Sequence, residues 1–194
     1  LLLNVDAYLS DYRQIPLSQF LPPPLGDGGT IVVNAGHVRI TGFEGEFEAR
    51  LGKGLQLDAT LSYLHYDVID LGQAAGQVGG LTLQSTAPYV PRWQGSVGAQ
   101  YTLGRADRGS LTLRADVSGR SLVYFDLANT PEAAQPGYLL TSLRLSWADA
   151  EDKWSAAFEI ANLTDKLYYD KAYTTHYVSV GAGRSALLTL NVKY

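Results

Sequence analysis

The stretch Ala186-Leu187-Leu188-Thr189-Leu190-Asn191-Val192-Lys193-Tyr194 decides the fold class of this chain. Apolar residues occupy every second position from Ala186 to Tyr194, and polar residues stand between most of them. Alternation at period two places the two sets on opposite faces of a β-strand. The stretch therefore predicts a strand with one apolar face, either in a soluble β-sandwich or across a membrane.

Seven further segments alternate in the same way. The eight segments cover residues 1–12, 38–51, 55–66, 93–103, 111–118, 142–147, 154–160 and 186–194. Most are close to the 9–11 residues that a tilted membrane strand needs. Within them, Glu44, Glu46 and Glu48 share one face only if the backbone is extended, because a helix would scatter them around its axis. The sequence therefore predicts an all-β chain of antiparallel strands.

The connections between these segments differ in length in a regular order. Short connections cover residues 52–54, 104–109 and 148–153, and long ones cover 13–37, 67–92, 126–137 and 164–183. Strict alternation of long and short connections is typical of outer-membrane β-barrels, which have long extracellular loops and short periplasmic turns. A soluble sandwich has no reason to sort its loops by side. We therefore expect an antiparallel transmembrane β-barrel with both chain termini on the periplasmic side.

Composition agrees with a barrel and argues against several other classes of protein. The 194 residues are 46% hydrophobic but contain no run of about 18 apolar residues, so no membrane-spanning helix is expected. The absence of cysteine excludes disulfides and thiolate metal sites. A net charge of -4 argues against nucleic acid as a partner. Tyr101, Trp147, Trp154 and Tyr194 lie near short turns and predict a lower aromatic belt in contact with lipid.

Four motifs resemble, in chain order, the C-terminal β-barrel portion of a TonB-dependent outer-membrane receptor. They are Asn34-Ala35-Gly36 with Arg39-Ile40-Thr41-Gly42-Phe43-Glu44-Gly45-Glu46, Ala87-Pro88-Tyr89-Val90-Pro91-Arg92-Trp93, Asn162-Leu163-Thr164-Asp165-Lys166-Leu167-Tyr168-Tyr169, and Gly183-Arg184. The third is the most specific, because the family has an Asn-Leu-x-Asp-Lys-x-Tyr run before its last extracellular loop. The resemblance covers essentially all 194 residues.

This resemblance implies a 22-stranded barrel whose lumen is filled by an N-terminal plug domain. Such receptors import iron-siderophores, haem, cobalamin or glycans across the outer membrane of Gram-negative bacteria. An inner-membrane TonB complex supplies the energy by pulling on a short N-terminal box. Residues 1–194 read as barrel strands only, begin inside a strand and contain no methionine. We therefore expect either a piece of a longer protein, whose plug, box and earlier strands are missing here, or a degenerate or truncated copy of such a receptor.

The resemblance also implies partners for the chain. They are outer-membrane lipid, the missing plug and barrel strands, and the barrel assembly machinery, with the TonB complex reached only through the absent N-terminal region. The assembly machinery would recognise the terminal signal Leu188, Leu190, Val192 and Tyr194 by strand addition. No cofactor is expected.

The long connection after Asp165 carries the candidate ligand-binding residues. They are Tyr168, Tyr169, Tyr173, His176 and Tyr177. An extracellular aromatic cluster can stack on a siderophore, haem or sugar, while an upper interfacial girdle with loop packing is the alternative explanation. The three histidines show no metal-ligand spacing, and no nucleophile–base motif or phosphate-binding loop indicates an enzyme. Asn162-Leu163-Thr164 fits a glycosylation sequon, which a bacterial outer-membrane protein would not normally use.

Two further expectations concern the faces of the strands. Ten apolar residues should face lipid: Phe43, Phe47, Leu57, Leu61, Val97, Leu113, Leu145, Phe158, Leu188 and Leu190. On the opposite, polar face, Arg114, Arg144 or Lys193, or residues of the plug, should neutralise the glutamates at positions 44, 46 and 48.

A second class of function stays open from the sequence. The chain could be a self-contained eight-stranded outer-membrane barrel with a structural or adhesion role, because a barrel of that size fills its own interior with side chains. An outer-membrane enzyme is the least favoured alternative. If the small barrel closes on itself, residues 3–10 should pair with residues 186–193. In a larger barrel the same two segments should lie apart, separated by other strands.

Overall fold

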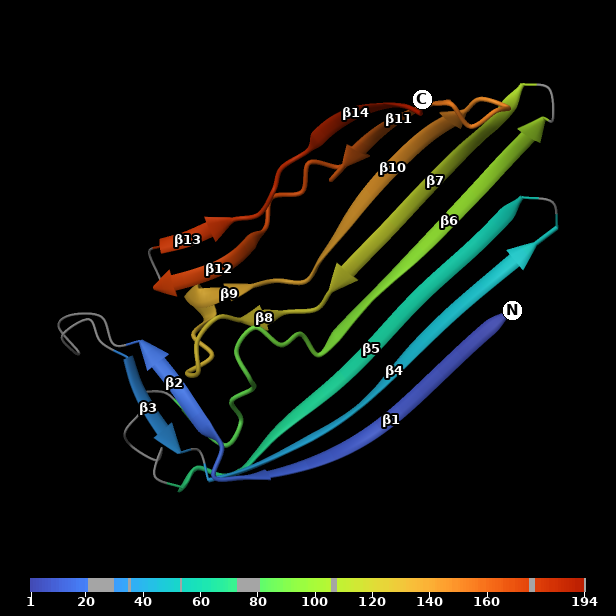
Figure 1. Ribbon diagram of the computed structural model, residues 1–194. Helices are drawn as coiled ribbons and strands as arrows, with labels where there is room; N and C mark the ends of the chain where they lie inside the picture. Colours follow the sequence, from blue (N-terminus) through green and yellow to red (C-terminus); the bar gives the residue numbers. More distant parts are fainter. Residues whose placement is uncertain are drawn as a thin grey trace.

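An antiparallel sheet of eight long strands dominates the structure (Figure 1). The computed structural model describes residues 1–20, 30–34, 36–52, 54–72, 81–105, 108–174 and 177–193. The eight strands are β1 (Leu2–Arg13), β4 (His37–Leu51), β5 (Leu55–Asp70), β6 (Trp93–Arg105), β7 (Gly109–Arg120), β10 (Tyr138–Ala148), β11 (Trp154–Ala161) and β14 (Ser185–Val192). They lie side by side in chain order. The predicted all-β class and the antiparallel arrangement are confirmed.

The two ends of the sheet carry different kinds of connection (Figure 1). The short turns after β4, β6 and β10 lie at one end, together with both chain termini. The long connections lie at the other end. We call these the turn end and the loop end. The predicted sorting of connections by side is confirmed.

The sheet is open rather than closed on itself. β1 and β14 form its opposite edges, and within the described residues the two strands do not pair. The test for a self-contained barrel therefore goes against the eight-stranded alternative. In hydrocarbon, an unpaired backbone N–H or C=O group costs several kcal/mol. Both edges of this sheet therefore need further strands if the sheet spans a membrane.

The strand register places all ten of the apolar residues predicted to face lipid on one face, which we call the apolar face. One row of directly paired residues crosses five strands and contains Tyr101, Leu113, Leu145, Phe158 and Leu188. A one-residue slip in any pair would move an apolar residue to the other face. The predicted alternation is therefore confirmed strand by strand.

The apolar face is not covered by any other part of the described chain. Val97 is 60% exposed, Leu113 52% and Leu188 64%. An apolar surface that extends over a whole sheet is rare on soluble monomers and marks contact with lipid or with another protein. In the described part of the chain, no helix has the length and apolar character needed to cross a membrane.

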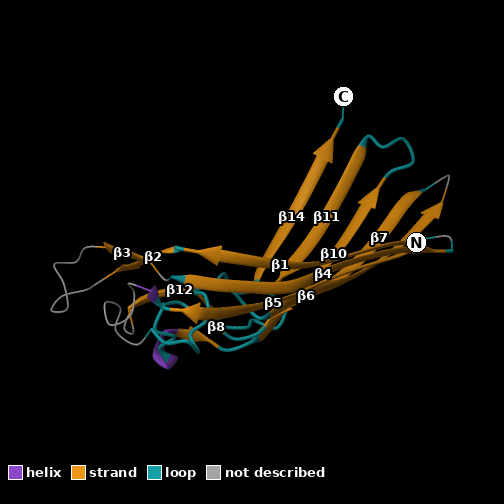
Figure 2. Ribbon diagram, turned by 90° about the horizontal axis from the view of Figure 1, so that it is seen from below, coloured by secondary structure: helices purple, strands orange, loops and turns teal. Residues whose placement is uncertain are grey.

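Short hairpins stand on the long connections, and the sequence analysis missed them. β2 (Pro16–Phe20) pairs with β3 (Thr30–Asn34), β8 (Val123–Tyr124) with β9 (Ala134–Gln135), and β12 (Tyr169–Thr174) with β13 (Tyr177–Val180). A 3-10 turn, η2 (Pro131–Ala133), precedes β9. Figure 2 shows these elements gathered at the loop end, beyond the long strands. Most pair over too few residues to produce a periodic pattern in the sequence.

A small hydrophobic cluster joins two of these loop elements. Val123 and Phe125 pack with Ala133, and Ala172 of β12 completes the cluster. Gln135 is buried beside it, and its side-chain Oε1 accepts a hydrogen bond from the backbone N–H of Tyr169 at 2.8 Å. The connections on either side of β10 and β11 are therefore packed together at the loop end.

Candidate functional site

The polar face of the sheet contains a hollow of about 920 Å³. Six strands line it, from β1 at one edge to β10. Its β1–β4 side is acidic, because Asp6, Glu44 and Glu46 lie there. Its β7–β10 side carries Arg120 and Tyr138. The hollow can therefore contact a polar molecule or a protein segment with opposite charges at its two sides.

A three-layer stack stands at the loop end of this hollow. The guanidinium carbon of Arg120 lies 4.9 Å from the centre of the Tyr138 ring. The Tyr168 ring stacks on the Tyr138 ring, with 4.7 Å between the ring centres and 26° between the ring planes. Arg120 ends β7 and Tyr138 begins β10, so the strand register makes them direct neighbours.

Two local features hold the stack in place. Gly181 donates its backbone N–H to the carbonyl oxygen of Tyr168 at 2.9 Å. A Cβ atom at position 181 would overlap the Tyr168 ring, so only glycine fits there. The Nε atom of Arg120 is buried and has no hydrogen-bond partner among the described residues. A ligand would therefore contact the other atoms of this guanidinium, which packs on an aromatic ring and is suited to an anionic or aromatic ligand.

The five loop residues predicted to bind a ligand do not form one cluster. Tyr168 is part of the stack, whereas Tyr169 packs against the hydrophobic cluster of the loops. Tyr177 in β13 is 71% exposed. Tyr173 belongs to β12, but its side chain lies outside what the structure describes, as does the whole of His176. Sequence reasoning missed Tyr138, whose signal is its position opposite Arg120 on a neighbouring strand.

Arg114 is the centre of a charged network on the polar face. Its Nη1 and Nη2 donate to the two carboxylate oxygens of Asp58 at 2.9 and 3.2 Å, and its Nε donates to Asp116 at 3.0 Å. Gly98 lies between these two carboxylates in the register of β5, β6 and β7. A Cβ atom there would overlap both Asp58 and Arg114, so glycine leaves the space that the guanidinium crosses.

The prediction that Arg114, Arg144 or Lys193 neutralises the stripe of glutamates at positions 44, 46 and 48 was wrong. Arg144 pairs with Glu159 at 2.7 Å, and Lys193 pairs with Asp152. Each cation pairs with a carboxylate on its own strand, a nearby strand or a neighbouring turn, and β4 lies on the far side of β5 and β6. Within the described residues, Glu46 accepts a hydrogen bond from Asn4 at 3.1 Å, and no ion pair reaches positions 44, 46 or 48. In the described part of the chain, the stripe is therefore an acidic surface free of ion pairs on the polar face.

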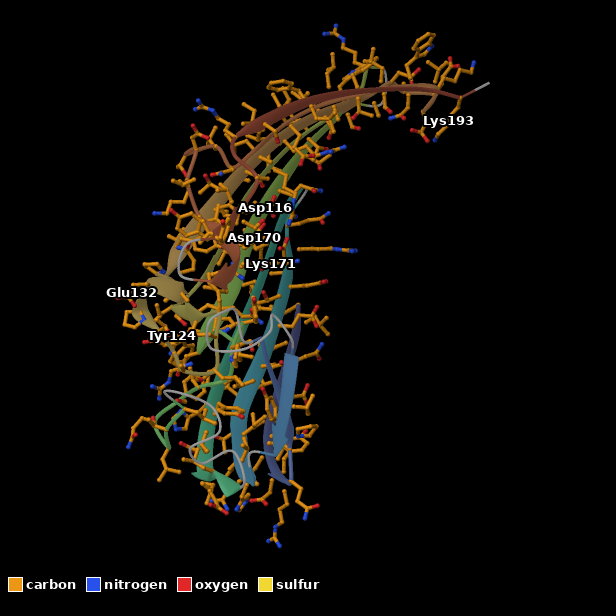
Figure 3. All side chains as sticks on the ribbon, turned by 90° about the vertical axis from the view of Figure 1, so that its left-hand side faces the viewer. Asp116, Tyr124, Glu132, Asp170, Lys171 and Lys193 are labelled. Carbon is orange, nitrogen blue, oxygen red and sulfur yellow. The ribbon has the colours of Figure 1, made fainter. Side chains whose placement is uncertain are left out.

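Charged side chains are spread over the whole length of the sheet (Figure 3). In that view Lys193 lies at the turn end, Asp116 lies along the strands, and Tyr124 and Glu132 lie towards the loop end. Two of the histidines pair with carboxylates at the loop end. His37 lies 2.7 Å from Asp11, and His65 lies 2.9 Å from Asp67. Within the described residues, no group of three or more potential ligands is placed to hold a metal ion.

The motif that begins at Asn162 closes the long connection between β11 and β14. The Asn162 side chain is buried, and its Nδ2 donates to the carbonyl oxygens of Lys166 at 2.9 Å and Ala182 at 3.1 Å. Its Oδ1 accepts the backbone N–H of Lys166 at 2.8 Å. Asp165 accepts the backbone N–H of Arg184 at 3.0 Å. Because every polar atom of the Asn162 amide is engaged and buried, the sequon reading does not fit this residue.

The proposed assembly signal lies on an open edge. Leu188, Leu190 and Val192 of β14 share the apolar face and are 64%, 70% and 38% exposed. Their strand pairs with β11 on one side only. Tyr194 lies outside the described residues.

Comparison with known families and proteins adds a separate line of information. Residues 1–163 match the family described as TonB dependent receptor-like, beta-barrel. The chain is 28% identical over 170 residues to the probable TonB-dependent siderophore receptor PiuA of Acinetobacter baumannii. It is 30% identical over 171 residues to the ferric-pyoverdine M114 receptor PbuA of a Pseudomonas species.

These alignments cover most of the chain but little of the relatives. They span 85% and 86% of this chain, and 22% and 19% of PiuA and PbuA. Among solved structures, the ferric yersiniabactin uptake receptor FyuA of Yersinia pestis is similar over 99% of this chain and 27% of its own. The TM-score is 0.78 at 20% identity, which shows a shared fold. The chain thus spans about a quarter or less of these proteins.

Proposed function

The chain belongs to the TonB-dependent receptor β-barrel family, and from this premise we propose that it supplies barrel strands to an outer-membrane receptor that imports a ferric siderophore. The observation that carries the proposal is the similarity over 85% of the chain to a relative named as a siderophore receptor. PbuA is likewise named for a ferric siderophore, pyoverdine. Haem, cobalamin and glycans have no such support.

The open edges of the sheet support a role as one part of a larger barrel. β1 and β14 each leave one side unpaired, and both would be exposed to lipid. We propose that further strands of the parent protein pair with them and that a plug domain fills the lumen. The free acidic stripe at positions 44, 46 and 48 then faces the plug and is complementary to basic side chains on it. Contact with a TonB complex would involve the parent protein outside these strands.

The stack at the loop end is the proposed ligand contact of these strands. Ferric siderophore complexes that carry carboxylates or aromatic rings suit a guanidinium backed by tyrosine rings. Arg120 and Tyr138 come from the rigid sheet, so their geometry does not depend on the long loops. Tyr168 adds a contact from the loop residues predicted to bind. Tyr177, which is exposed on β13, is a second-ranked candidate.

We expect Arg120→Gln in the full-length parent receptor to weaken binding of ferric pyoverdine or a ferric catecholate about tenfold. The substitution removes the charge but keeps a donor beside Tyr138. Titration of the detergent-purified receptor with each chelate, followed by intrinsic fluorescence, measures the dissociation constant. Lys193→Gln at the turn end is the matched control and should leave binding unchanged. Equal affinity for all three proteins would remove the stack from the binding site, and no binding of either chelate by the unaltered receptor would contradict the proposed function.

The terminal strand supports a separate prediction about assembly. Deleting Tyr194 should impair insertion of the parent receptor in cells far more than it lowers the stability of refolded barrel. The reason is that the barrel assembly machinery would recognise an open edge with alternating apolar residues by strand addition, while one interfacial tyrosine contributes little to the stability of a folded barrel. The measurement is the amount of heat-modifiable, folded receptor in outer-membrane fractions. Normal insertion of the shortened protein would reduce Tyr194 to a residue of the aromatic belt.

A further inference from the structure

The apolar face carries a groove between β5, β6, β7 and β10. Its volume is about 340 Å³, and its walls are the side chains of Leu61, Val97 and Leu139. Gly95 and Gly119 pair directly with each other and form its floor. A methyl group at position 119 would overlap the Leu139 side chain in its present position, so glycine leaves this part of the hollow open.

Aromatic residues mark the end of the groove that lies nearer the loops. Trp93 lines it, and the register places Trp93, Tyr63 and Phe43 side by side on three neighbouring strands. The ring centres of Tyr63 and Trp93 lie 4.5 Å apart, and those of Phe43 and Tyr63 lie 5.7 Å apart. A row of aromatic side chains at one height on the lipid side of a barrel is typical of the membrane–water interface.

Charged residues follow immediately beyond this row on the same face. They are His65 in the next row, and Asp11, Arg39 and Asp67 in the row after that. Arg39 donates to Asp11 at 3.2 Å, and His65 pairs with Asp67. These side chains cannot lie in hydrocarbon without a large cost. The aromatic row therefore marks the upper limit of the apolar band, and the groove begins directly beneath it.

Arg92 occupies the boundary between the two zones. Its Nη2 donates to the Tyr63 hydroxyl at 2.9 Å, and its guanidinium carbon lies 5.4 Å from the centre of the same ring. Tyr63 thus holds the guanidinium on the apolar face beside Trp93. Arg92 is exposed, and no ion pair to it occurs within the described residues. Its remaining N–H groups are available to an anion that approaches from the membrane.

We propose that this groove binds one anionic, phosphate-bearing lipid, with an acyl chain over the two glycines and the phosphate on Arg92. The proposal rests on the outer-membrane placement in the proposed function. A lipid fits better than a protein segment, because the hollow lies on the apolar face and the charged residues of that face begin only above the aromatic row, at the height of the headgroups. Arginine matches phosphate through parallel N–H donors, which supplies the charge complementarity.

The test uses the full-length parent receptor, purified in detergent and titrated with phosphatidylglycerol or phosphatidylcholine while native mass spectrometry counts bound lipid. We expect the unaltered protein to retain phosphatidylglycerol preferentially, and Arg92→Gln to lower that retention about tenfold. Arg13→Gln is the control for charge, because Arg13 is equally a loop-end arginine but lies outside the groove. Val97→Trp fills the groove from its wall and should reduce retention of both lipids. Leu145→Trp, elsewhere on the same face, should not.

The outcomes separate this inference from the proposed function. Equal retention by Arg92→Gln and Arg13→Gln, or by Val97→Trp and Leu145→Trp, overturns the lipid site. All four variants replace exposed side chains, so each is expected to fold, and heat-modifiable migration on gels checks that they do. If the unaltered receptor fails to insert into vesicles, this result contradicts both the proposed membrane placement and the lipid site that rests on it. Insertion together with equal lipid retention overturns the lipid site alone.

Discussion

Replacing Leu113 with arginine should lower the free energy of unfolding in a bilayer by about 2–4 kcal/mol. Leu113 lies on the apolar face of β7, where it pairs with Tyr101 on one side and Leu145 on the other. Along β7 the apolar face runs from Gly119 to Leu111, so Leu113 lies one row from the middle. A guanidinium there must reach water past apolar neighbours on both sides, which makes the substitution costly.

The matched control is Ser142→Arg. Ser142 faces the polar side and pairs directly with Asp116, so the new charge gains a partner in water. Chemical denaturation of the parent receptor refolded into lipid vesicles measures both variants. Leu113→Arg should be much less stable than the unaltered protein, and Ser142→Arg should stay within about 0.5 kcal/mol of it. If the two variants are equally stable, the apolar face is not the lipid face.

The long strands could be read from the sequence because one physical rule decides them. A strand half in lipid and half facing a lumen must alternate at every residue, and Ala186, Leu188, Leu190 and Val192 show this without any knowledge of their neighbours. The sorting of the connections by length identified the two ends of the sheet. Strand register was not predicted, but the alternation allows only registers that keep the apolar residues together.

The charged contacts could not be read in the same way. Arg114 bonds to Asp58 across an intervening strand, and this needs both the register of three strands and the space left by Gly98. A sequence shows that charges share a face but not which pairs lie at one height. Tyr138 was missed for the same reason, because its value as a site residue comes from Arg120 beside it and from Tyr168 above it.

The motif that begins at Asn162 has a structural role that its sequence does not reveal. Its sequence resembles a family signature and fits a glycosylation sequon, whereas in the structure it ties the two ends of a long connection together. Asn162 bonds to Lys166 just ahead and to Ala182 at the far end. The stacked Tyr168 lies between those two points of closure. We call the hydrogen bonds of Asn162 to Lys166 and Ala182 the clamp. The clamp therefore holds the segment that carries Tyr168, a residue of the candidate binding site.

Asn162→Ala should accordingly destabilise the parent receptor by about 3 kcal/mol, because three hydrogen bonds are lost at a buried position. Alanine also resists the positive φ of 47° that this residue adopts. Asn162→Gly removes the same hydrogen bonds but accepts that backbone conformation, so it should recover about 1 kcal/mol of the loss. Asn191→Ala is the control, since Asn191 is exposed and makes a single side-chain bond of 3.3 Å to Ser155.

Two measurements test the clamp at different levels. Denaturation in vesicles gives the loss of stability, and hydrogen exchange reports the backbone N–H groups of Lys166 and Arg184, which the motif engages directly. Both groups should exchange faster in Asn162→Ala, while those of β11 and β14 keep their protection, because the strand ladders do not depend on the asparagine amide. Exchange that rises equally throughout the sheet would mean that the residue supports the barrel as a whole. An Asn162→Ala protein as stable as Asn191→Ala would show that the connection is held closed by other contacts.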